Sequence, residues 1–225
     1  MAGYGQFCPV AKAMELLDER WTLLVVRELL MGSRRFSELQ RGVPRMSPAL
    51  LSKRLRRLTR AGVVDRVAGP GGVQYALTLA GRELLPVVES VGRWGARWVP
   101  ELGETDLDPH LLLWDMHRNL NLAALPESGA VLEFRFPDVP GAAGRWWLVA
   151  TSGGADVCDA DPGQPVTVTV SAPLRLLVQW WRGDVSWPGA LRTGLIVQGP
   201  SWARRALPGW LRLSPFAEVP RPAPA

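Results

Sequence analysis

The chain has 225 residues, of which 47% are hydrophobic and 21% charged, a composition typical of a soluble globular protein of one large or two ordinary domains. Its two cysteines, Cys8 and Cys158, lie far apart, which excludes a disulfide framework and a cysteine zinc site and favours a reducing compartment. The sequence shows no signal peptide and no uncharged apolar run of about 18 residues, so we expect a cytoplasmic protein that does not contact a membrane.

Charge is unevenly distributed along the chain, whose formal net charge is +5. Residues 1–100 contain 16 of the 26 basic residues and 8 of the 21 acidic ones, a net charge of +8. Residues 101–225 carry a net charge of −3. A basic half joined to a mildly acidic half predicts one module that binds a polyanion and a second module with another role.

Three short helices are predicted near the N-terminus. Residues 10–17 have apolar side chains at helical spacing, and we expect Ala11, Met14 and Leu17 to face inward. Residues 21–30 predict a second, more apolar helix that ends before Gly32, and residues 36–40 predict the third.

The most informative segment follows, because residues 39–64 contain no acidic side chain. Ser47 is a suitable N-cap, and Pro48 a suitable first residue, for a helix that runs to Arg60. Its apolar face is predicted to contain Leu51, Leu55 and Leu58, with Leu50 on the flank. The remaining faces carry Ser52, Lys53, Arg56, Arg57 and Arg60. An amphipathic helix with an almost purely cationic outer face predicts contact with nucleic acid.

A hairpin and a long helix complete the N-terminal half. Residues 63–67 and 73–77 read as two strands around the turn at residues 69–72, as in the wing of a winged helix. A helix is expected from Leu79 to about Val99, kinked at Pro86. Its apolar seam is formed by Leu84, Val88 or Val87, Val91, Trp94 and Trp98. We expect this seam to form a dimer interface, the alternative being packing against the second domain of the same chain.

These residues resemble HxlR-type winged-helix regulators over about residues 7–98. The resemblance is carried by Cys8-Pro9-Val10, Arg20-Trp21-Thr22-Leu23-Leu24, Arg27-Glu28-Leu29-Leu30, Arg35-Phe36-Ser37-Glu38-Leu39, Ser47-Pro48-Ala49-Leu50-Leu51-Ser52, Arg54-Leu55 and Ala61-Gly62-Val63-Val64. Asp18-Glu19 stands where Gly-Gly is commoner, and Arg45-Met46 where Gly-Ile is commoner. The resemblance implies a homodimeric bacterial transcription factor that is related to the MarR group and binds double-stranded operator DNA.

Individual roles follow from position on the basic helix. Ser52, Lys53 and Arg56 lie near its front, where base edges are reached. The first turn, at Ser47 and Pro48, suits a phosphate. The candidate DNA-binding residues are Arg34, Arg35, Ser47, Pro48, Ser52, Lys53, Arg56, Arg57, Arg60 and Arg66. Arg54 lies close to the apolar face, so a structural ion pair is as good an interpretation as a DNA contact.

Cys8 has two interpretations. In some relatives of this family an N-terminal cysteine senses oxidants, but a small, buried apolar side chain is the commoner role of such a residue.

The C-terminal half begins after a boundary near Pro100–Asp108, so the expected domains are residues 1–101 and 106–225. Helices are predicted at residues 111–122, 173–181 and 201–207, and strands at residues 131–136, 145–151, 155–158, 165–171 and 195–197. A sheet covered by helices on one side makes the whole chain an α+β protein. No metal or cofactor site is predicted, because His110 and His117 have no suitable Cys, Asp or Glu arrangement and the aspartates at 156, 159 and 161 lack a calcium-loop pattern.

Residues 108–212 resemble a sterol-carrier-protein-like domain. The resemblance is carried by Asp161, Val166-Thr167-Val168-Thr169-Val170, Leu174–Trp181, Gly183-Asp184, Ala190-Leu191-Arg192-Thr193-Gly194 and Leu195-Ile196-Val197-Gln198-Gly199. The family's fold encloses an apolar tunnel for a lipid-like molecule. The candidate ligand-binding residues are Trp146, Trp147, Trp180, Trp181 and Trp202. The alternative is that these tryptophans fill a core or a domain interface.

We therefore expect a non-enzymatic, dimeric regulator whose operator affinity is controlled by an apolar small-molecule effector in the C-terminal domain. One alternative makes Cys8 the oxidant sensor. Another is a lipid carrier or enzyme with a secondary winged helix.

Overall fold

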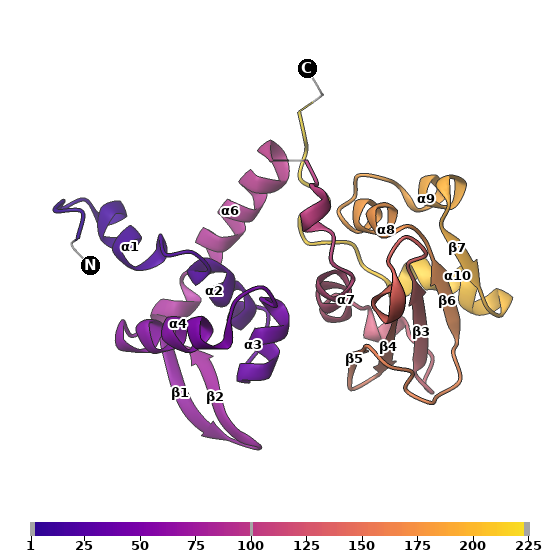
Figure 1. Ribbon diagram of the computed structural model, residues 1–225, viewed down its shortest axis with the longest axis horizontal. Helices are drawn as coiled ribbons and strands as arrows, with labels where there is room; N and C mark the ends of the chain where they lie inside the picture. The colour runs from indigo at the N-terminus through magenta and orange to yellow at the C-terminus, as the bar shows by residue number, and fades with distance from the viewer. Residues whose placement is uncertain (1–2, 100, 223–225) are drawn as a thin grey trace. The chain divides into compact units, whose positions relative to one another are not determined.

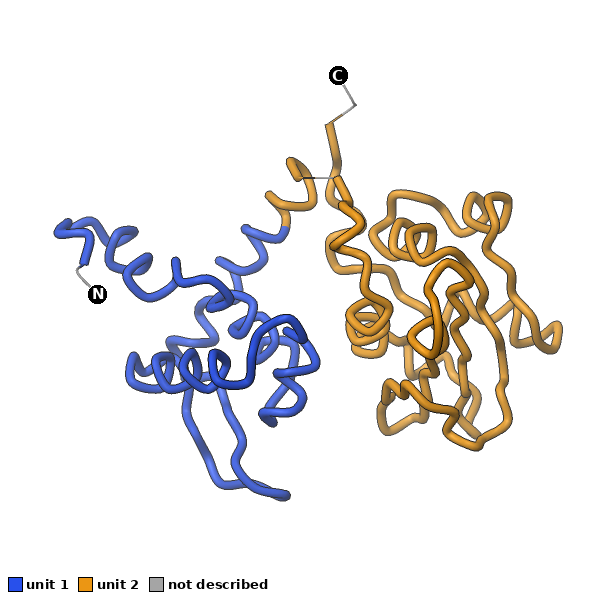
Figure 2. Tube along the Cα trace, viewed as in Figure 1, with its two compact units in different colours: residues 1–92 blue, residues 93–225 orange. Residues whose placement is uncertain are grey.

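The computed structural model describes residues 3–99 and 101–222. The chain divides into two compact units, Met1–Gly92 and Arg93–Ala225 (Figure 2). This division falls a few residues before the domain boundary expected from the sequence, and Pro100 lies outside the described residues.

The N-terminal unit starts with four helices that surround an apolar core. They are α1 (Pro9–Leu17), α2 (Thr22–Leu30), α3 (Phe36–Gly42) and α4 (Pro48–Arg60). Leu17 is buried as expected, but Met14 is 38% exposed, so its predicted inward position is wrong. Trp21 precedes α2 in the left-handed region at φ 78°, so α2 begins one residue later than predicted.

Local sequence and core packing together explain α4. The Ser47 hydroxyl accepts a hydrogen bond from the Leu50 amide at 3.3 Å, as expected of an N-cap. Leu51, Leu55 and Leu58 are fully buried in the core. The predicted apolar face is therefore confirmed, and the opposite face of α4 points away from the core.

The predicted wing is present. Strands β1 (Val64–Gly69) and β2 (Gly72–Leu77) pair antiparallel, and Gly69 faces Gly72 across the turn (Figure 1). Gly71 has φ +80°, a conformation that favours glycine in this tight turn. The Tyr75 amide donates to the Arg34 carbonyl at 2.8 Å, which ties the wing to the segment before α3.

The expected single long helix is wrong in detail. The chain forms a short α5 (Leu79–Arg82) and then α6 (Leu85–Trp98). Pro86 lacks an amide hydrogen and cannot continue the α5 ladder, so the helix breaks just before it. Leu84 and Val88 pack against the N-terminal core, whereas Val91, Trp94 and Trp98 are 54–61% exposed.

The C-terminal unit is a five-stranded sheet with helices, which confirms the mixed helix–sheet class. The strand order is β5-β4-β3-β6-β7, with β3 and β6 parallel and the other neighbours antiparallel (Figure 1). The strands are β3 (Ala130–Arg135), β4 (Arg145–Thr151), β5 (Gly154–Cys158), β6 (Val168–Ser171) and β7 (Ile196–Gln198). The helices are α7 (Pro109–Arg118), α8 (Leu174–Trp181), α9 (Trp187–Thr193) and α10 (Ser201–Trp210), with 3-10 turns at Glu104–Asp106, Leu122–Ala124 and Gly141–Gly144.

The two faces of this sheet differ in chemistry. Leu132 and Phe134 of β3 point into the core that α7, α8 and α10 share. Glu133 lies between them in sequence and therefore points to the opposite face. Its carboxylate accepts hydrogen bonds from Arg135 (2.9 Å), Arg145 (2.5 Å) and Thr169 (2.9 Å). Burial raises the pKa of Glu133, but these three donors outweigh burial and hold the pKa below its ordinary value.

Candidate nucleic-acid interface

The outer face of α4 carries exposed cations. Lys53, Arg56 and Arg60 are exposed, and Ser52 is half-buried beside them. Because α4 contains no acidic residue, these charges have no carboxylate on their own helix. The exposed N-terminal turn at Ser47 and Pro48 presents the positive end of the helix dipole to solvent, which attracts anions.

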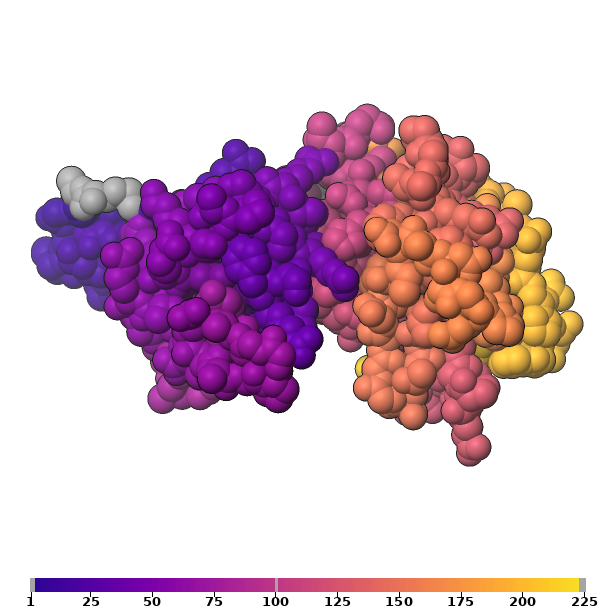
Figure 3. Space-filling model, turned by 60° about the horizontal axis from the view of Figure 1, so that its bottom comes forward, coloured from indigo at the N-terminus to yellow at the C-terminus, as the bar shows by residue number. Residues whose placement is uncertain are grey.

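A groove of about 620 Å³ separates this helix from the wing. It is lined by Ser52, Arg56, Thr59 and Arg60 of α4, and by Arg66 and Tyr75 of the wing. Both elements belong to the purple part of the space-filling view (Figure 3). The fold thus brings three predicted arginines to one concave surface. Thr59 and Tyr75 were not predicted; Thr59 lies three residues after Arg56, so helical spacing alone indicated its position.

Arg34 and Arg35 lie at the start of α3 and are both exposed. Their backbone amides donate to Glu38 at 2.7 and 3.0 Å, which fixes the first turn of the helix. The Arg35 guanidinium donates to the Pro70 carbonyl at the wing tip, at 3.2 Å. Arg35 therefore supplies charge to a wing tip that is otherwise glycine and proline.

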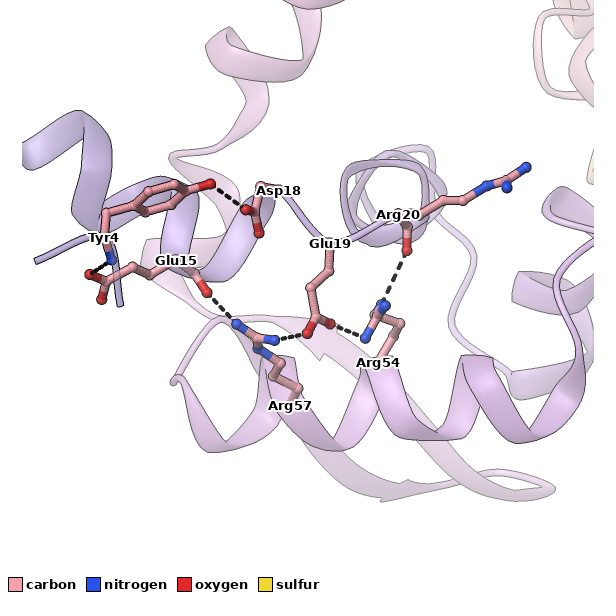
Figure 4. A network of polar contacts seen from close by, with 7 residues as sticks. All are labelled: Tyr4, Glu15, Asp18, Glu19, Arg20, Arg54 and Arg57. Atoms are coloured by element: carbon pink, nitrogen blue, oxygen red, sulfur yellow. Dashed lines mark hydrogen bonds and ion pairs between the residues drawn. The ribbon is translucent and has the colours of Figure 1, made fainter. Parts of the chain in front are cut away.

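Two arginines of α4 form ion pairs and hydrogen bonds within the N-terminal unit (Figure 4). Arg54 is buried, pairs with Glu19 and donates to the Arg20 carbonyl at 3.2 Å. This confirms its interpretation as a structural ion pair. Arg57, a candidate DNA-binding residue, pairs with the same Glu19 and donates to the Glu15 carbonyl. Sequence reasoning missed these contacts because Glu19 lies 38 residues before Arg57.

Cys8 is the residue that precedes α1, and its thiol is free. Hydrogen bonds from the backbone of Ala11 and Val10 lower the pKa of this thiol.

The candidate ligand-binding tryptophans do not share one environment. Trp147, Trp180 and Trp181 are buried, whereas Trp202 is 50% exposed and its ring contacts Trp210. Trp146 is half-buried and donates to the Ala143 carbonyl at 2.7 Å. The Trp147 Nε1 atom is buried and has no hydrogen-bond partner in the described part of the chain.

Residues 3–99 and 101–222 contain no group of three His, Cys, Asp or Glu side chains that could hold a metal ion. None of their helices is long and apolar enough to span a membrane.

Comparison with known proteins identifies the N-terminal unit. The model of the HxlR-like helix-turn-helix family matches residues 16–102. The HTH-type transcriptional regulator YvaP of Bacillus subtilis is 38% identical over 98 residues, 42% of this chain and 91% of the relative. The regulator sll1512 of Synechocystis is 37% identical over 100 residues, 43% of this chain and 74% of the relative. The reduced form of the B. subtilis regulator YodB has 30% identity, a TM-score of 0.38 and coverage of 43% of this chain and 100% of that chain.

The match of the family model ends at residue 102, so the resemblance of later residues to sterol-carrier proteins stays a prediction. The covered part includes the end of α1, all of α2, α3 and α4, and the wing. The chain belongs to the HxlR-like helix-turn-helix family of transcriptional regulators.

Proposed function

We propose that this DNA-binding regulator places α4 in the major groove of double-stranded operator DNA. The observation that carries the proposal is the groove between α4 and the wing, where three arginines meet without an acidic residue in the lining. Ser52, Lys53 and Arg56 reach base edges, since the front of a recognition helix enters the groove. Arg34, Arg35, Ser47, Pro48, Arg60 and Arg66 contact the phosphate backbone.

The regulator acts as a homodimer through α6 in this proposal. Val91, Trp94 and Trp98 present a half-exposed apolar seam at helical spacing, which favours a partner surface of the same kind. A two-fold dimer binds a pseudo-palindromic site whose half-sites lie about one helical turn apart.

Two arginine variants test the DNA interface. Arg56→Ala should reduce operator affinity by roughly 1–3 kcal/mol and relax specificity at one base pair, because a bidentate contact to guanine is lost. Arg35→Ala should weaken binding to all DNA sequences alike, because a phosphate contact is lost. It should also reduce the slope of log affinity against log salt concentration by about one unit. Fluorescence anisotropy with operator and scrambled duplexes at several salt concentrations measures both effects.

The control for this experiment is Arg205→Ala, an exposed arginine on α10 outside the proposed interface, which should change neither affinity nor salt dependence. Unchanged affinity and specificity for Arg56→Ala would contradict the role assigned to α4.

We further propose that an apolar effector binds the C-terminal unit and changes operator affinity. The buried Trp147 Nε1 atom supports this, because it has no hydrogen-bond partner in the described residues. A buried indole N–H usually donates to an acceptor, and a bound effector would supply one here. Anilinonaphthalene sulfonate, a lipophilic aromatic probe, should quench tryptophan fluorescence and shift operator affinity about 5–150-fold. Trp147→Phe should weaken that response, whereas Trp202→Phe on the exposed surface should not.

Oxidant sensing through Cys8 is the alternative, and the lowered pKa of this thiol is its support. If the probe leaves operator affinity unchanged, while diamide changes it in the wild type and not in Cys8→Ser, the effector proposal fails and the alternative holds.

A further inference from the structure

One carboxylate serves two cations of the recognition helix. Glu19 lies in the turn between α1 and α2, and its two oxygens pair separately with Arg54 and Arg57 (Figure 4). The side chains of Arg54, Glu19 and Arg57 are only 10%, 13% and 24% exposed. Solvent therefore screens these pairs less than it screens pairs at the surface.

The same turn also binds both guanidinium groups through backbone carbonyls. Arg54 donates to Arg20, and Arg57 donates to Glu15 at the end of α1. Each arginine is thus held by a carboxylate and a carbonyl from one short segment. Removing either guanidinium from this network to meet a phosphate would leave the Glu19 carboxylate with one partner fewer in a poorly solvated place.

The other cations of α4 have a different environment. Lys53, Arg56 and Arg60 are exposed, and the Arg60 guanidinium donates to the Arg56 carbonyl of the same helix at 3.4 Å. These side chains are able to displace counterions from DNA, whereas a cation that Glu19 holds inside the unit does not contact phosphate and releases none.

We propose that Glu19 is an internal counter-ion that withholds Arg54 and Arg57 from DNA and uses them to position the recognition helix. This inference rests on the proposed function of α4. Glu19 is a positioning residue. It reduces the number of cations on α4 that attract DNA phosphates irrespective of sequence. Base contacts are left to Ser52, Lys53 and Arg56.

The experiment measures the slope of log affinity against log salt concentration for a scrambled duplex. Each phosphate contact contributes about 0.9 to this slope. Arg57→Gln should leave the slope unchanged. Arg60→Gln is the matched control, an exposed arginine of the same helix that is proposed to contact phosphate, and it should reduce the slope by about 0.9. Glu19→Gln should release Arg57 and make the slope steeper by up to about one unit, with higher affinity for the scrambled duplex.

The double variant Glu19→Gln/Arg57→Gln separates release of charge from a change in fold. It should return to the wild-type slope, because the released cation is no longer present. A slope for Glu19→Gln that equals wild type in a folded protein would overturn the inference.

If circular dichroism shows that Glu19→Gln does not fold, the salt slope of Arg57→Gln tests the inference instead. An unchanged slope supports the inference, and a loss of about 0.9 overturns it because Arg57 would then contact DNA directly. An unchanged slope for Arg60→Gln would instead overturn the proposed interface, whichever result Arg57→Gln gives.

Discussion

The recognition helix and the outer face of the C-terminal sheet differ in how many of their cations are paired within the unit. On the sheet, the single carboxylate of Glu133 collects donors from β3, β4 and β6, so the cluster is completed within the unit. On α4, one carboxylate at Glu19 holds Arg54 and Arg57, while Lys53, Arg56 and Arg60 stay exposed. The cations that stabilise the fold are paired with a carboxylate that is largely buried, and the cations left for a polyanion are exposed.

The aromatic residues show the same contrast. Trp147, Trp180 and Trp181 in the C-terminal unit are buried, and Trp210 is 1% exposed. On α6, Trp94 and Trp98 are more than half exposed. Exposure of two tryptophans on one helix costs free energy in water, which favours an interface there.

The largest effect is expected where an indole is completely buried. Trp210→Ala should lower the free energy of unfolding of the C-terminal unit by about 3–5 kcal/mol, because it removes apolar contacts and leaves a cavity. Urea denaturation followed by circular dichroism measures the change. The neighbouring Trp202→Ala is the control and should cost only about 1 kcal/mol, because its ring is half exposed and loses mainly the edge contact with Trp210. Equal losses would remove the contrast between packed and exposed indoles.

The next effect concerns the α6 seam. The double variant Val91→Glu/Trp94→Glu should place uncompensated charge in an apolar interface and yield monomers. Operator affinity should then fall at least about 100-fold, since the two half-sites are no longer bound by one particle. Sedimentation velocity and anisotropy provide the measurements. An intact dimer would show that the exposed tryptophans of α6 serve another contact.

The smallest expected effect is a loss of folding stability at acidic pH that is caused by His117. Burial, with help from the charge of Arg118, lowers the pKa of His117 from 6.5 to about 4. As the pH falls below 6.5, the unfolded chain binds a proton at this site before the folded chain does, so folding stability is lost between pH 6.5 and about 4. After allowance for partial exposure, the loss is about 2 kcal/mol.

Urea titrations at pH 7 and pH 4.5 check this prediction. His117→Gln should reduce the difference in stability between the two pH values, because glutamine does not titrate. His110→Gln, at the other histidine of the chain, should retain the difference. If both variants behave like the wild type, the pH dependence belongs to other groups.

Local signals predicted the DNA-binding half well. The Ser47 cap, the leucines at helical spacing in α4 and the glycine-rich turn of the wing each act within a few residues, so they can be read from the chain. Two predictions failed for different reasons. Met14 lies exposed because helical periodicity does not show which apolar side chains the tertiary core reaches. The expected long helix divides into α5 and α6 because Pro86 lacks the amide hydrogen that a continuous helix needs, where only a kink was predicted.

The sequence by itself determined which residues form α4, which of its sides is apolar and how many cations it carries, because helical periodicity and capping are local properties. Only the tertiary structure decided which of those cations are available. Arg56 and Arg57 are adjacent and chemically identical, yet Arg56 lines the groove beside the wing and Arg57 is paired with Glu19. The reason is that an ion pair depends on distance in space, and the turn that carries Glu19 reaches α4 only when the helices pack.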